Sequence, residues 1–233
     1  MRPASRRLIL FDIDGTLVND GGASRDAFAQ ALATVYGYRG DVGRYDFSGR
    51  TDPYIAYMVL RDDGFSDEEI AAKLPALWHA YIAGLQRNAT PDRVRSLPGM
   101  AALLEALRAM DTITLALLTG NIEPGARLKL EPPALNEYFS FGAFGSDSAN
   151  RSDLPPIAVE RASQRDGYRF EGPDVVIIGD SIYDVRCGAP YDATTIAVAS
   201  GKTPAELLRA EHPSHFFESA EDLRGMLAAI CEG

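Results

Sequence analysis

Short apolar runs alternate with longer segments of helical periodicity through the second half of this 233-residue chain. The run Val175-Val176-Ile177-Ile178 is apolar at every position, which is typical of a strand buried on both faces of a parallel sheet. Such alternation indicates an α/β fold with a Rossmann-like, doubly wound parallel sheet as its core. The predicted strands span residues 7–13, 113–118, 141–145, 175–178 and 195–199, and the predicted helices of this part span residues 100–110, 125–130, 154–166, 181–189, 204–210 and 220–231.

The interval from residue 18 to residue 95 breaks this rhythm, because it contains helical patterns and no convincing strand. It is far longer than the dozen or so residues that a crossover between parallel strands requires. We therefore predict an α/β core domain of residues 1–17 plus 96–233 and an inserted, all-helical cap domain of residues 18–95. A set of ordinary crossover helices is the alternative. Helices are predicted at 24–36, 52–61, 67–74 and 77–87, with Ser66 as an N-cap.

Two carboxylates end the first predicted strand. In Phe11-Asp12-Ile13-Asp14-Gly15-Thr16-Leu17, Asp12 and Asp14 stand two residues apart, directly before a glycine turn. Like charges held this close are costly unless a cation shares the site. A plain Asp-Gly turn is the alternative interpretation of the string when it is considered alone.

Polar groups follow two other predicted strands in the same way. Thr119-Gly120-Asn121 comes after one strand, where a hydroxyl beside backbone N–H groups can bind a phosphoryl oxygen. Asp180 and Asp184, in Gly179-Asp180-Ser181-Ile182-Tyr183-Asp184, come after the most apolar strand and share a helix face if a helix begins there. Helix capping by Thr119, or by Asp180 or Ser181, is the simpler alternative. Because ligands bind beyond the carboxyl ends of parallel strands, we expect these groups to converge.

Composition narrows the classes of function. The net charge of −10 argues against a nucleic-acid footprint, which would need a basic face, but a small anionic substrate is compatible with it. No stretch approaches the ~18 apolar residues that span a bilayer, and the apolar run near the amino terminus is too short for a secretory signal. Cys187 and Cys231 form no metal-type or redox pair. We expect a cytoplasmic protein, a monomer or homodimer, with no membrane or nucleic-acid partner.

Taken together, the ordered motifs Asp12-Ile13-Asp14-Gly15-Thr16, Thr119-Gly120-Asn121 and Gly179-Asp180-Ser181 through Asp184 resemble those of the haloacid-dehalogenase superfamily. The helical insert resembles the helical cap of that superfamily, and the subgroup most similar in pattern is that of phosphoglycolate-phosphatase-like enzymes. The resemblance implies Mg²⁺-dependent hydrolysis of a small phosphorylated metabolite, phosphoglycolate-like or a sugar phosphate.

The resemblance also implies roles for the residues. Asp12 would attack phosphorus and form an aspartyl-phosphate, and Asp14 would act as general acid and base. Mg²⁺ would be bound by Asp12, the backbone carbonyl of Asp14, and Asp180, with Asp184 behind them. The second carboxylate favours phosphoryl transfer over dehalogenation, because halide departs without a proton. Oxygens of the transferred group would be bound by Thr119, by backbone N–H groups near Gly120 and Asn121, and by a cation.

The cation departs from the family pattern, which usually has a lysine near the helix preceding the Gly-Asp-Ser motif. None of the three lysines lies there, so we predict that Arg151 takes this role. Lys129 is the first rival. Eight residues of helix at about 1.5 Å per residue would place it around 12 Å from Asn121, so we expect it on the helix surface. Lys202 is a weaker rival, because its loop is expected to lie farther from the first strand.

Within the predicted cap, Phe47-Ser48-Gly49-Arg50-Thr51-Asp52 is the most polar, glycine-bearing stretch before a helix. We predict that Arg50 reaches the substrate, with a surface ion pair to Asp46 or Asp52 as the alternative. Two other functions remain open. One is a phosphotransferase or phosphomutase that uses the same nucleophile, and the other is a phospho-aspartate signalling module or a scaffold without catalysis.

Overall fold

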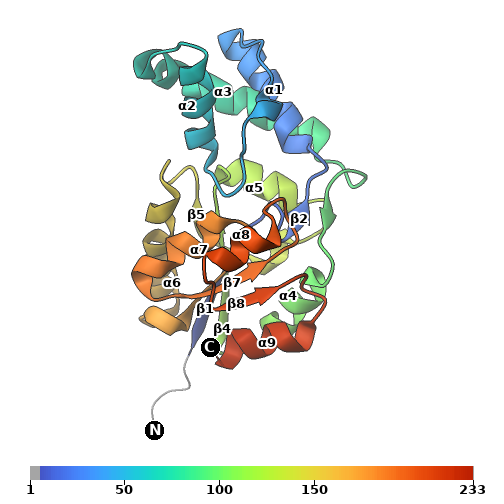
Figure 1. Cartoon of the computed structure of the whole chain (residues 1–233), viewed down its shortest axis with the longest axis vertical. Helices are drawn as coiled ribbons and strands as arrows, with labels where there is room; N and C mark the ends of the chain where they lie inside the picture. The colour runs from blue at the N-terminus through green and yellow to red at the C-terminus, as the bar shows by residue number, and fades with distance from the viewer. Residues whose placement is uncertain (1–5, 233) are drawn as a thin grey trace.

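The computed structural model describes residues 6–232 and contains a parallel sheet of six strands in the order β5-β4-β1-β6-β7-β8 (Figure 1). The first strand, β1, lies in the middle and pairs with β4 on one side and β6 on the other. The order therefore reverses direction between β1 and β6, which is the switch point where doubly wound sheets bind ligands. The strands are β1 (Arg7–Phe11), β4 (Ile113–Thr119), β5 (Gly142–Phe144), β6 (Val175–Gly179), β7 (Thr194–Val198) and β8 (His215–Phe217).

The sequence predicts five of these strands, with ends that differ by one or two residues from those observed. The sixth strand, β8, was not predicted. It is three residues long and only half-buried, so it lacks the continuous apolar run of the central strands. The predicted α/β class and the doubly wound sheet are confirmed.

Helices cover both faces of the sheet, as alternation along β1 illustrates. Leu8 and Leu10 face one cluster of apolar residues, which includes Leu154, whereas Ile9 and Phe11 face the other. The first face is covered by α6 and α7, with α8 packed beyond them on Ala197, and the second by α4, α5 and α9. These helices are α4 (Met100–Arg108), α5 (Glu123–Leu130), α6 (Leu154–Asp166), α7 (Ile182–Gly188), α8 (Ala205–Ala210) and α9 (Leu223–Glu232).

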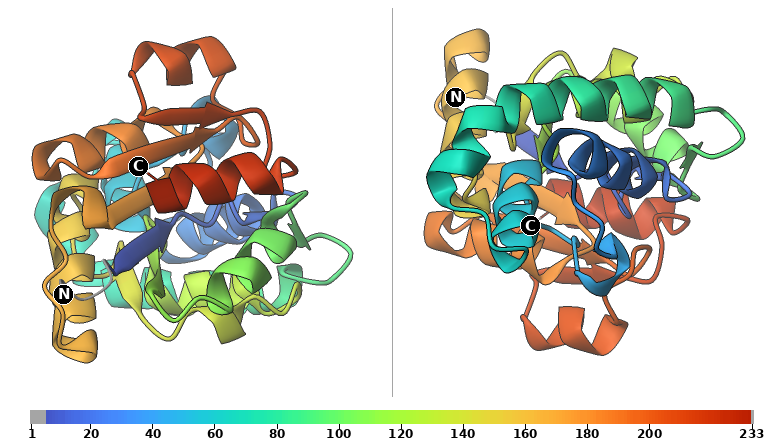
Figure 2. Two further views of the ribbon diagram at one scale, coloured as in Figure 1. Left: turned by 90° about the horizontal axis from the view of Figure 1, so that it is seen from below. Right: turned by 90° about the horizontal axis from the view of Figure 1, so that it is seen from above.

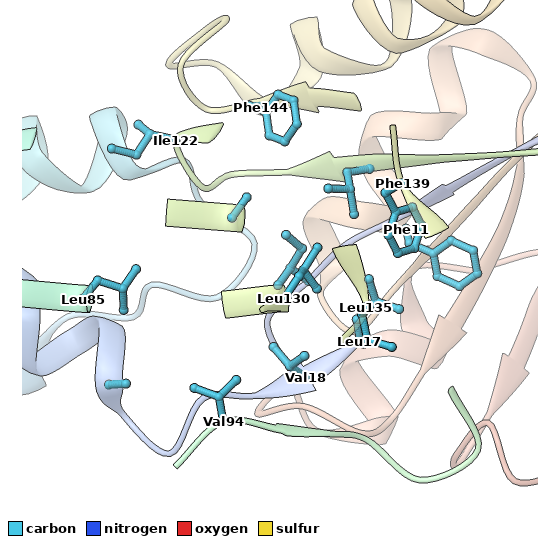
Figure 3. Close-up of a cluster of buried hydrophobic side chains, with 14 of the residues drawn as sticks. Phe11, Leu17, Val18, Leu85, Val94, Ile122, Leu130, Leu135, Phe139 and Phe144 are labelled. Atoms are coloured by element: carbon cyan, nitrogen blue, oxygen red, sulfur yellow. The ribbon is translucent and has the colours of Figure 1, made fainter. Parts of the chain in front are cut away.

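The larger apolar cluster continues beyond the sheet toward residues of the long insert (Figure 3). Phe11 at the end of β1 packs edge-on against Phe139, with ring centroids 5.8 Å apart. Leu130 of α5 and Val18 belong to the same cluster, as does Leu85 of the insert. The carboxyl end of the central strand is thus anchored in the main core, which fixes the turn that follows it.

The insert forms three helices that lie over the sheet at the carboxyl ends of its strands (Figures 1 and 2). They are α1 (Ala23–Tyr36), α2 (Asp52–Asp62) and α3 (Asp67–Asn88). Ser66 caps α3 as predicted, in a capping box with Glu69.

The prediction of two helices at 67–74 and 77–87 was wrong, because α3 runs unbroken through Pro75. A proline inside a helix costs about 3 kcal/mol. In α3, however, Ile70, Leu77, Tyr81 and Leu85 form one buried stripe that continues past the proline. Packing of the whole stripe, mainly against α1, outweighs the local cost.

Two short strands connect the insert to the sheet. β2 (Val18–Asn19) and β3 (Arg95–Ser96) pair antiparallel, and the Leu97 N–H donates to the Leu17 carbonyl beside them. The two segments that lead into and out of the insert therefore form one two-stranded ribbon, β2 with β3, which lies at the predicted domain boundaries. The division into a core domain and a cap domain stays a prediction. Within residues 6–232, no helix is both long enough and apolar enough to cross a bilayer.

Candidate active site

A cavity of about 270 Å³ lies between the carboxyl edge of the sheet and the helices of the insert. Its floor is formed by segments that follow β1, β4, β6 and β7, and its roof by α1, α2 and the loop before α2. The described residues that line it include Asp12, Asp14, Asp20, Arg25, Ser48, Arg50, Asp52, Asn121, Lys129, Arg151, Asp180, Ser200, Gly201 and Lys202. The sheet thus brings together most of the residues singled out from the sequence.

Asp12 is fixed by the sheet itself. It follows β1 directly, and its backbone N–H donates to the carbonyl of Ile178 on the neighbouring strand at 3.0 Å. Its carboxylate is buried and, within the part of the chain that the structure describes, accepts one hydrogen bond, from Nη2 of Arg151 at 3.0 Å. Burial, and secondarily the nearby Asp184 and Asp14, raises the pKa of Asp12 to about 7, although Arg151 opposes this shift.

Asp180 lies opposite Asp12 at the end of β6. The described residues give its carboxylate one weak donor, the Thr16 hydroxyl at 3.4 Å. Burial, followed by the charges of Asp12 and Asp184, raises the pKa of Asp180 well above its usual range. Carboxylate oxygens of Asp12, Asp180 and Asp184 all lie within 4.8 Å of one another. Such a cluster of buried like charges is the environment that a hard divalent cation stabilises.

Two glycines make room for the Asp180 carboxylate. A Cβ on Gly15 would lie 2.5 Å from Asp180 Oδ2, and Gly15 also has φ +82°, which side chains rarely adopt. A Cβ on Gly201, in the loop after β7, would lie 1.6 Å from the same oxygen. The glycine turn after Asp14 therefore serves the packing of Asp180 as well as its own backbone geometry.

Arg151, in the 3-10 helix Arg151–Asp153, is buried and lies between two carboxylates. Its Nη2 contacts Asp12 and also forms an ion pair with Asp184. Burial alone would lower its pKa, but Asp184 and Asp12 outweigh burial and raise it, so the guanidinium stays charged. The structure thus places Arg151 against Asp12, the predicted nucleophile.

Asp184 is the fixed end of this network. One carboxylate oxygen contacts Arg151, and the other accepts from the Ser181 N–H at 2.9 Å and the Ser181 hydroxyl at 2.6 Å. Ser181 caps α7, as one of the alternatives stated, and Asp184 completes a capping box. Asp180 is left out of the cap, so its carboxylate remains directed to the cavity.

Asp14 shows where the sequence-based interpretation was wrong about Lys129. The Lys129 side chain is 3% exposed, and its Nζ lies 2.7 and 2.9 Å from the two Asp14 oxygens and 2.6 Å from Asn121 Oδ1. The predicted separation of around 12 Å considered only backbone rise. It neglected the long lysine side chain, which points back toward the helix amino terminus.

The charge of Lys129 is secured by its surroundings. Burial would lower its pKa, but Asp14, and further out Asp20 and Asp52, outweigh burial and raise it. A signal for its burial existed in the sequence, because Lys129 stands between Leu128 and Leu130 on a short helix. A lysine surrounded by apolar positions needs a carboxylate partner.

Thr119 and Gly120 lie behind the cavity wall, and they are absent from its described lining residues. The Thr119 hydroxyl is fully buried and accepts from Asn121 Nδ2 at 2.8 Å, while the same amide donates to Asp14 at 2.8 Å. Asn121 is thus the member of this motif that reaches the cavity. Contact of Thr119 or Gly120 with a phosphoryl group stays a prediction.

The first residue of α2, Asp52, touches the Thr119 motif directly. The Asp52 N–H donates to the Gly120 carbonyl at 2.7 Å, and the Asp52 carboxylate accepts from the Ile122 N–H at 2.8 Å. Burial raises the pKa of Asp52 to about 6, although Lys129 and the Ile122 N–H oppose the shift. Asp52 therefore joins the roof of the cavity to its floor, a role that the sequence analysis missed.

Arg50 and Lys202 both line the cavity, from opposite sides. The Arg50 guanidinium lies over the rings of Tyr54 and Tyr183, at 4.8 and 5.2 Å. Its Nε is buried without a hydrogen-bond partner among the described residues. The Lys202 loop was expected to lie far from the first strand, and this expectation was wrong. The adjacent Ser200 hydroxyl donates to the Gly15 carbonyl at 2.7 Å.

Comparison with known proteins identifies the family. The model of the haloacid dehalogenase-like hydrolase family matches residues 9–189, a range that contains every motif residue described above. The chain belongs to this family. The predictions of the family and of an enzyme are therefore confirmed.

Individual relatives of this haloacid dehalogenase-like hydrolase are distant. Pyrophosphatase PpaX of Halalkalibacterium halodurans is 25% identical over 215 residues, which cover 92% of this chain and 94% of the relative. A predicted phosphoglycolate phosphatase from Haemophilus somnus matches with a TM-score of 0.71 at 18% identity, covering 96% of this chain and 99% of its own. A protein from Bacteroides vulgatus provisionally assigned as a beta-phosphoglucomutase matches with a TM-score of 0.68 at 19% identity, covering 99% and 91%. These two structural matches support the fold.

Proposed function

We propose that the protein hydrolyses a small phosphomonoester through an aspartyl-phosphate on Asp12, with Asp14 as general acid and base. The observation that carries this proposal is that Asp12, Asp14, Asp180 and Arg151, from three separate segments, line one cavity. Among residues 6–232, only Arg151 donates a hydrogen bond to the Asp12 carboxylate, which leaves its other oxygen available to attack phosphorus. Membership of a hydrolase family supports the same reaction class.

The proposed chemistry balances in two steps. An Asp12 oxygen forms a bond to phosphorus while the bond from phosphorus to the ester oxygen breaks, and Asp14 gives its proton to the departing alkoxide. Water then attacks the same phosphorus, gives a proton to Asp14, and releases inorganic phosphate with the Asp12 carboxylate restored. Arg151 holds Asp12 in place and offsets its charge during both steps.

A divalent cation fits the residues present. The clustered oxygens of Asp12, Asp180 and Asp184, the weakly bonded Asp180 carboxylate and its raised pKa are what an oxygen-ligating cation would relieve. We propose that Asp12, the Asp14 backbone carbonyl and Asp180 hold Mg²⁺, with Asp184 bracing Arg151 from behind. When bound, the ion would supply positive charge to the phosphoryl oxygens.

The insert is proposed to act as the cap domain that covers the substrate. Arg50 and Ser48 line the roof of the cavity, where the leaving group of a substrate attached to Asp12 would lie. Arg50 has no carboxylate partner among its recorded contacts, which supports a role in substrate binding over the alternative of a surface ion pair. A cytoplasmic location and a monomeric or homodimeric state stay predictions.

The test is a screen for release of inorganic phosphate. Purified protein would be incubated with Mg²⁺ and a panel of phosphoglycolate, sugar phosphates and pyrophosphate, the last because of the activity named for the PpaX relative. We expect kcat/KM to single out one substrate class, and we expect the matched variant Asp12→Asn to release none. Undiminished release by Asp12→Asn would overturn the proposal. Transfer of phosphate to a second substrate would instead favour a mutase, and a stable phosphoprotein without turnover would favour a signalling module.

A further inference from the structure

Lys129 is a buried cation for which the mechanism above has no use. It projects from α5, and its ammonium group contacts both oxygens of Asp14 and the side-chain oxygen of Asn121. All of these contacts are within 2.9 Å, and together they use the donors that an ammonium group has. Lys129 is therefore committed to this network and is not a free phosphate-binding charge.

The contacts of Lys129 and Asn121 restrict the orientation of the Asp14 carboxylate. The Asp14 side chain is 43% exposed, so packing alone leaves its carboxylate free to rotate. Lys129 and Asn121 contact it from two directions, and Asn121 is itself held by the Thr119 hydroxyl at the end of β4. The carboxylate orientation is thus fixed relative to a central strand and to α5, neither of which belongs to its own turn.

We propose that Lys129 is a positioning residue, which holds the Asp14 carboxylate in the orientation that proton transfer to the leaving group requires. This inference rests on the proposed function, because it assumes that Asp14 moves the proton. A general acid contributes only when it lies within hydrogen-bond reach of the reacting oxygen, so a rotated Asp14 would be ineffective.

The proposed role predicts a dependence on the leaving group. Cleavage of an alkyl phosphate needs a proton on the departing oxygen, whereas p-nitrophenolate departs without one. Lys129→Met should therefore lower kcat/KM for an alkyl phosphate by about 10²-fold and for p-nitrophenyl phosphate by much less. Asp14→Asn should show the same selectivity for the alkyl ester. A purely structural role of Lys129 would lower both values equally.

The experiment is a double-mutant cycle with both esters, comparing wild type, Lys129→Met, Asp14→Asn and the double variant. Lys73→Met is the matched control, because Lys73 is an exposed lysine on α3. We expect Lys73→Met to match wild type, and Lys129→Met to have little further effect once Asp14→Asn is present. Equal losses on both esters, or additive losses in the double variant, would overturn the inference.

The same double-mutant cycle still tests the proposal if Lys129→Met does not fold. The double variant removes both partners of the ion pair, which is less disruptive than leaving Asp14 without its cation. If the single variant unfolds, the comparison of Asp14→Asn with the double variant decides: a further loss of more than about twofold would overturn the inference. Absence of phosphate release by wild type would instead overturn the proposed function.

Discussion

The active-site region has two halves, each built around one aspartate of the Asp12-Ile13-Asp14 turn. On the nucleophile side, Asp12 is buried with Arg151, Asp180 and Asp184, and this side contains the clustered carboxylates. On the acid–base side, Asp14 is 43% exposed and is held by Lys129 and Asn121. Two aspartates that stand two residues apart just after β1 thus differ in exposure and have separate cations.

The difference follows from what each carboxylate would have to do. A nucleophile reacts in its ionised form, and burial of Asp12 raises its pKa to about 7, so it needs neighbouring positive charge. Arg151 suits this place because its Nη2 contacts both carboxylates at once and the guanidinium stays charged. Asp14 would have to contact the leaving group, which requires exposure to the cavity. The ammonium group of Lys129 contacts the Asp14 carboxylate and still leaves this side chain partly exposed. Burial and access are therefore divided between the two aspartates.

The largest effects are expected when each aspartate is neutralised in turn, which tests whether the two have separate roles. Asp12→Asn should lower kcat by roughly 10⁴-fold or more, because no bond to phosphorus can form. Asp14→Asn should lower kcat/KM by about 10²–10⁴-fold, with a smaller loss for an activated ester. Steady-state kinetics with both esters would measure this. Losses of kcat/KM in Asp14→Asn that are equal on the two esters, as expected for Asp12→Asn, would mean that the halves have no separate roles.

Removal of the cation should affect mainly the nucleophile side, where two of its three proposed ligands, Asp12 and Asp180, lie. Chelation with EDTA should lower kcat by at least about 10²-fold, and saturating Mg²⁺ should raise the thermal midpoint of unfolding by about 5–10 °C. Thermal unfolding of Asp180→Asn should show no such rise, whereas Lys73→Met should keep it. A full rise in Asp180→Asn would contradict the assignment of Asp180 as a ligand.

Replacing Arg151 tests whether geometry or charge matters on the nucleophile side. Arg151→Met should lower kcat/KM by about 10²–10³-fold, and it should destabilise the fold by about 3–5 kcal/mol, because it leaves two buried carboxylates without their cation. Arg151→Lys keeps the charge but loses the planar contact, so we expect intermediate values. Kinetics and urea unfolding would measure both effects. Wild-type activity in Arg151→Lys would show that charge alone suffices.

The smallest expected effect concerns Asp52, which faces Lys129 from the roof. Its folded-state pKa of about 6 lies above the ordinary 3.8, so the folded state binds this proton more tightly than the unfolded state. Its contribution to stability is therefore present at low pH and is lost as pH rises through the folded-state pKa. Relative to Asp52→Asn, the free energy of unfolding of wild type should fall by ~3 kcal/mol between about pH 4 and pH 7. Urea unfolding of both proteins at a series of pH values would measure this. If the interpretation is wrong, the difference in their free energies of unfolding will not change with pH.

The sequence was sufficient for five of the six strands of the sheet, because these are mostly apolar runs that alternate with helical segments, but it missed the short, half-buried β8. It was also sufficient to find Asp12, Asp14 and Asp180, since parallel strands bring their carboxyl ends to one edge. Prediction from the sequence failed where the position of a residue depends on a long side chain or on the conformation of a loop. Lys129 reaches the site because its side chain is long. The loop of Lys202 returns to the turn after β1, and the pattern of apolar residues does not predict the conformation of a loop.

Contacts across the cavity were likewise beyond the sequence. Asp52 was recognised as the start of a helix, yet its bonds to Gly120 and Ile122 depend on how α2 is placed over the sheet. The long helix α3 was predicted as two helices because the apolar stripe that continues past Pro75 was not recognised. Both cases show tertiary packing overriding a local signal.

The ribbon of β2 and β3 has a mechanical consequence. The Gly15 N–H donates to the Val18 carbonyl at 2.9 Å, and Asp14 forms an isolated bridge with Val18, so the first strand of the ribbon is attached to the turn that carries Asp14. A tilt of the three upper helices about this attachment would pull on the turn that carries Asp14, against the contacts of Asp14 with Lys129 and Asn121. An exchange of these helices between homologues should therefore transplant both ribbon strands as one unit, so that this turn keeps its attachment.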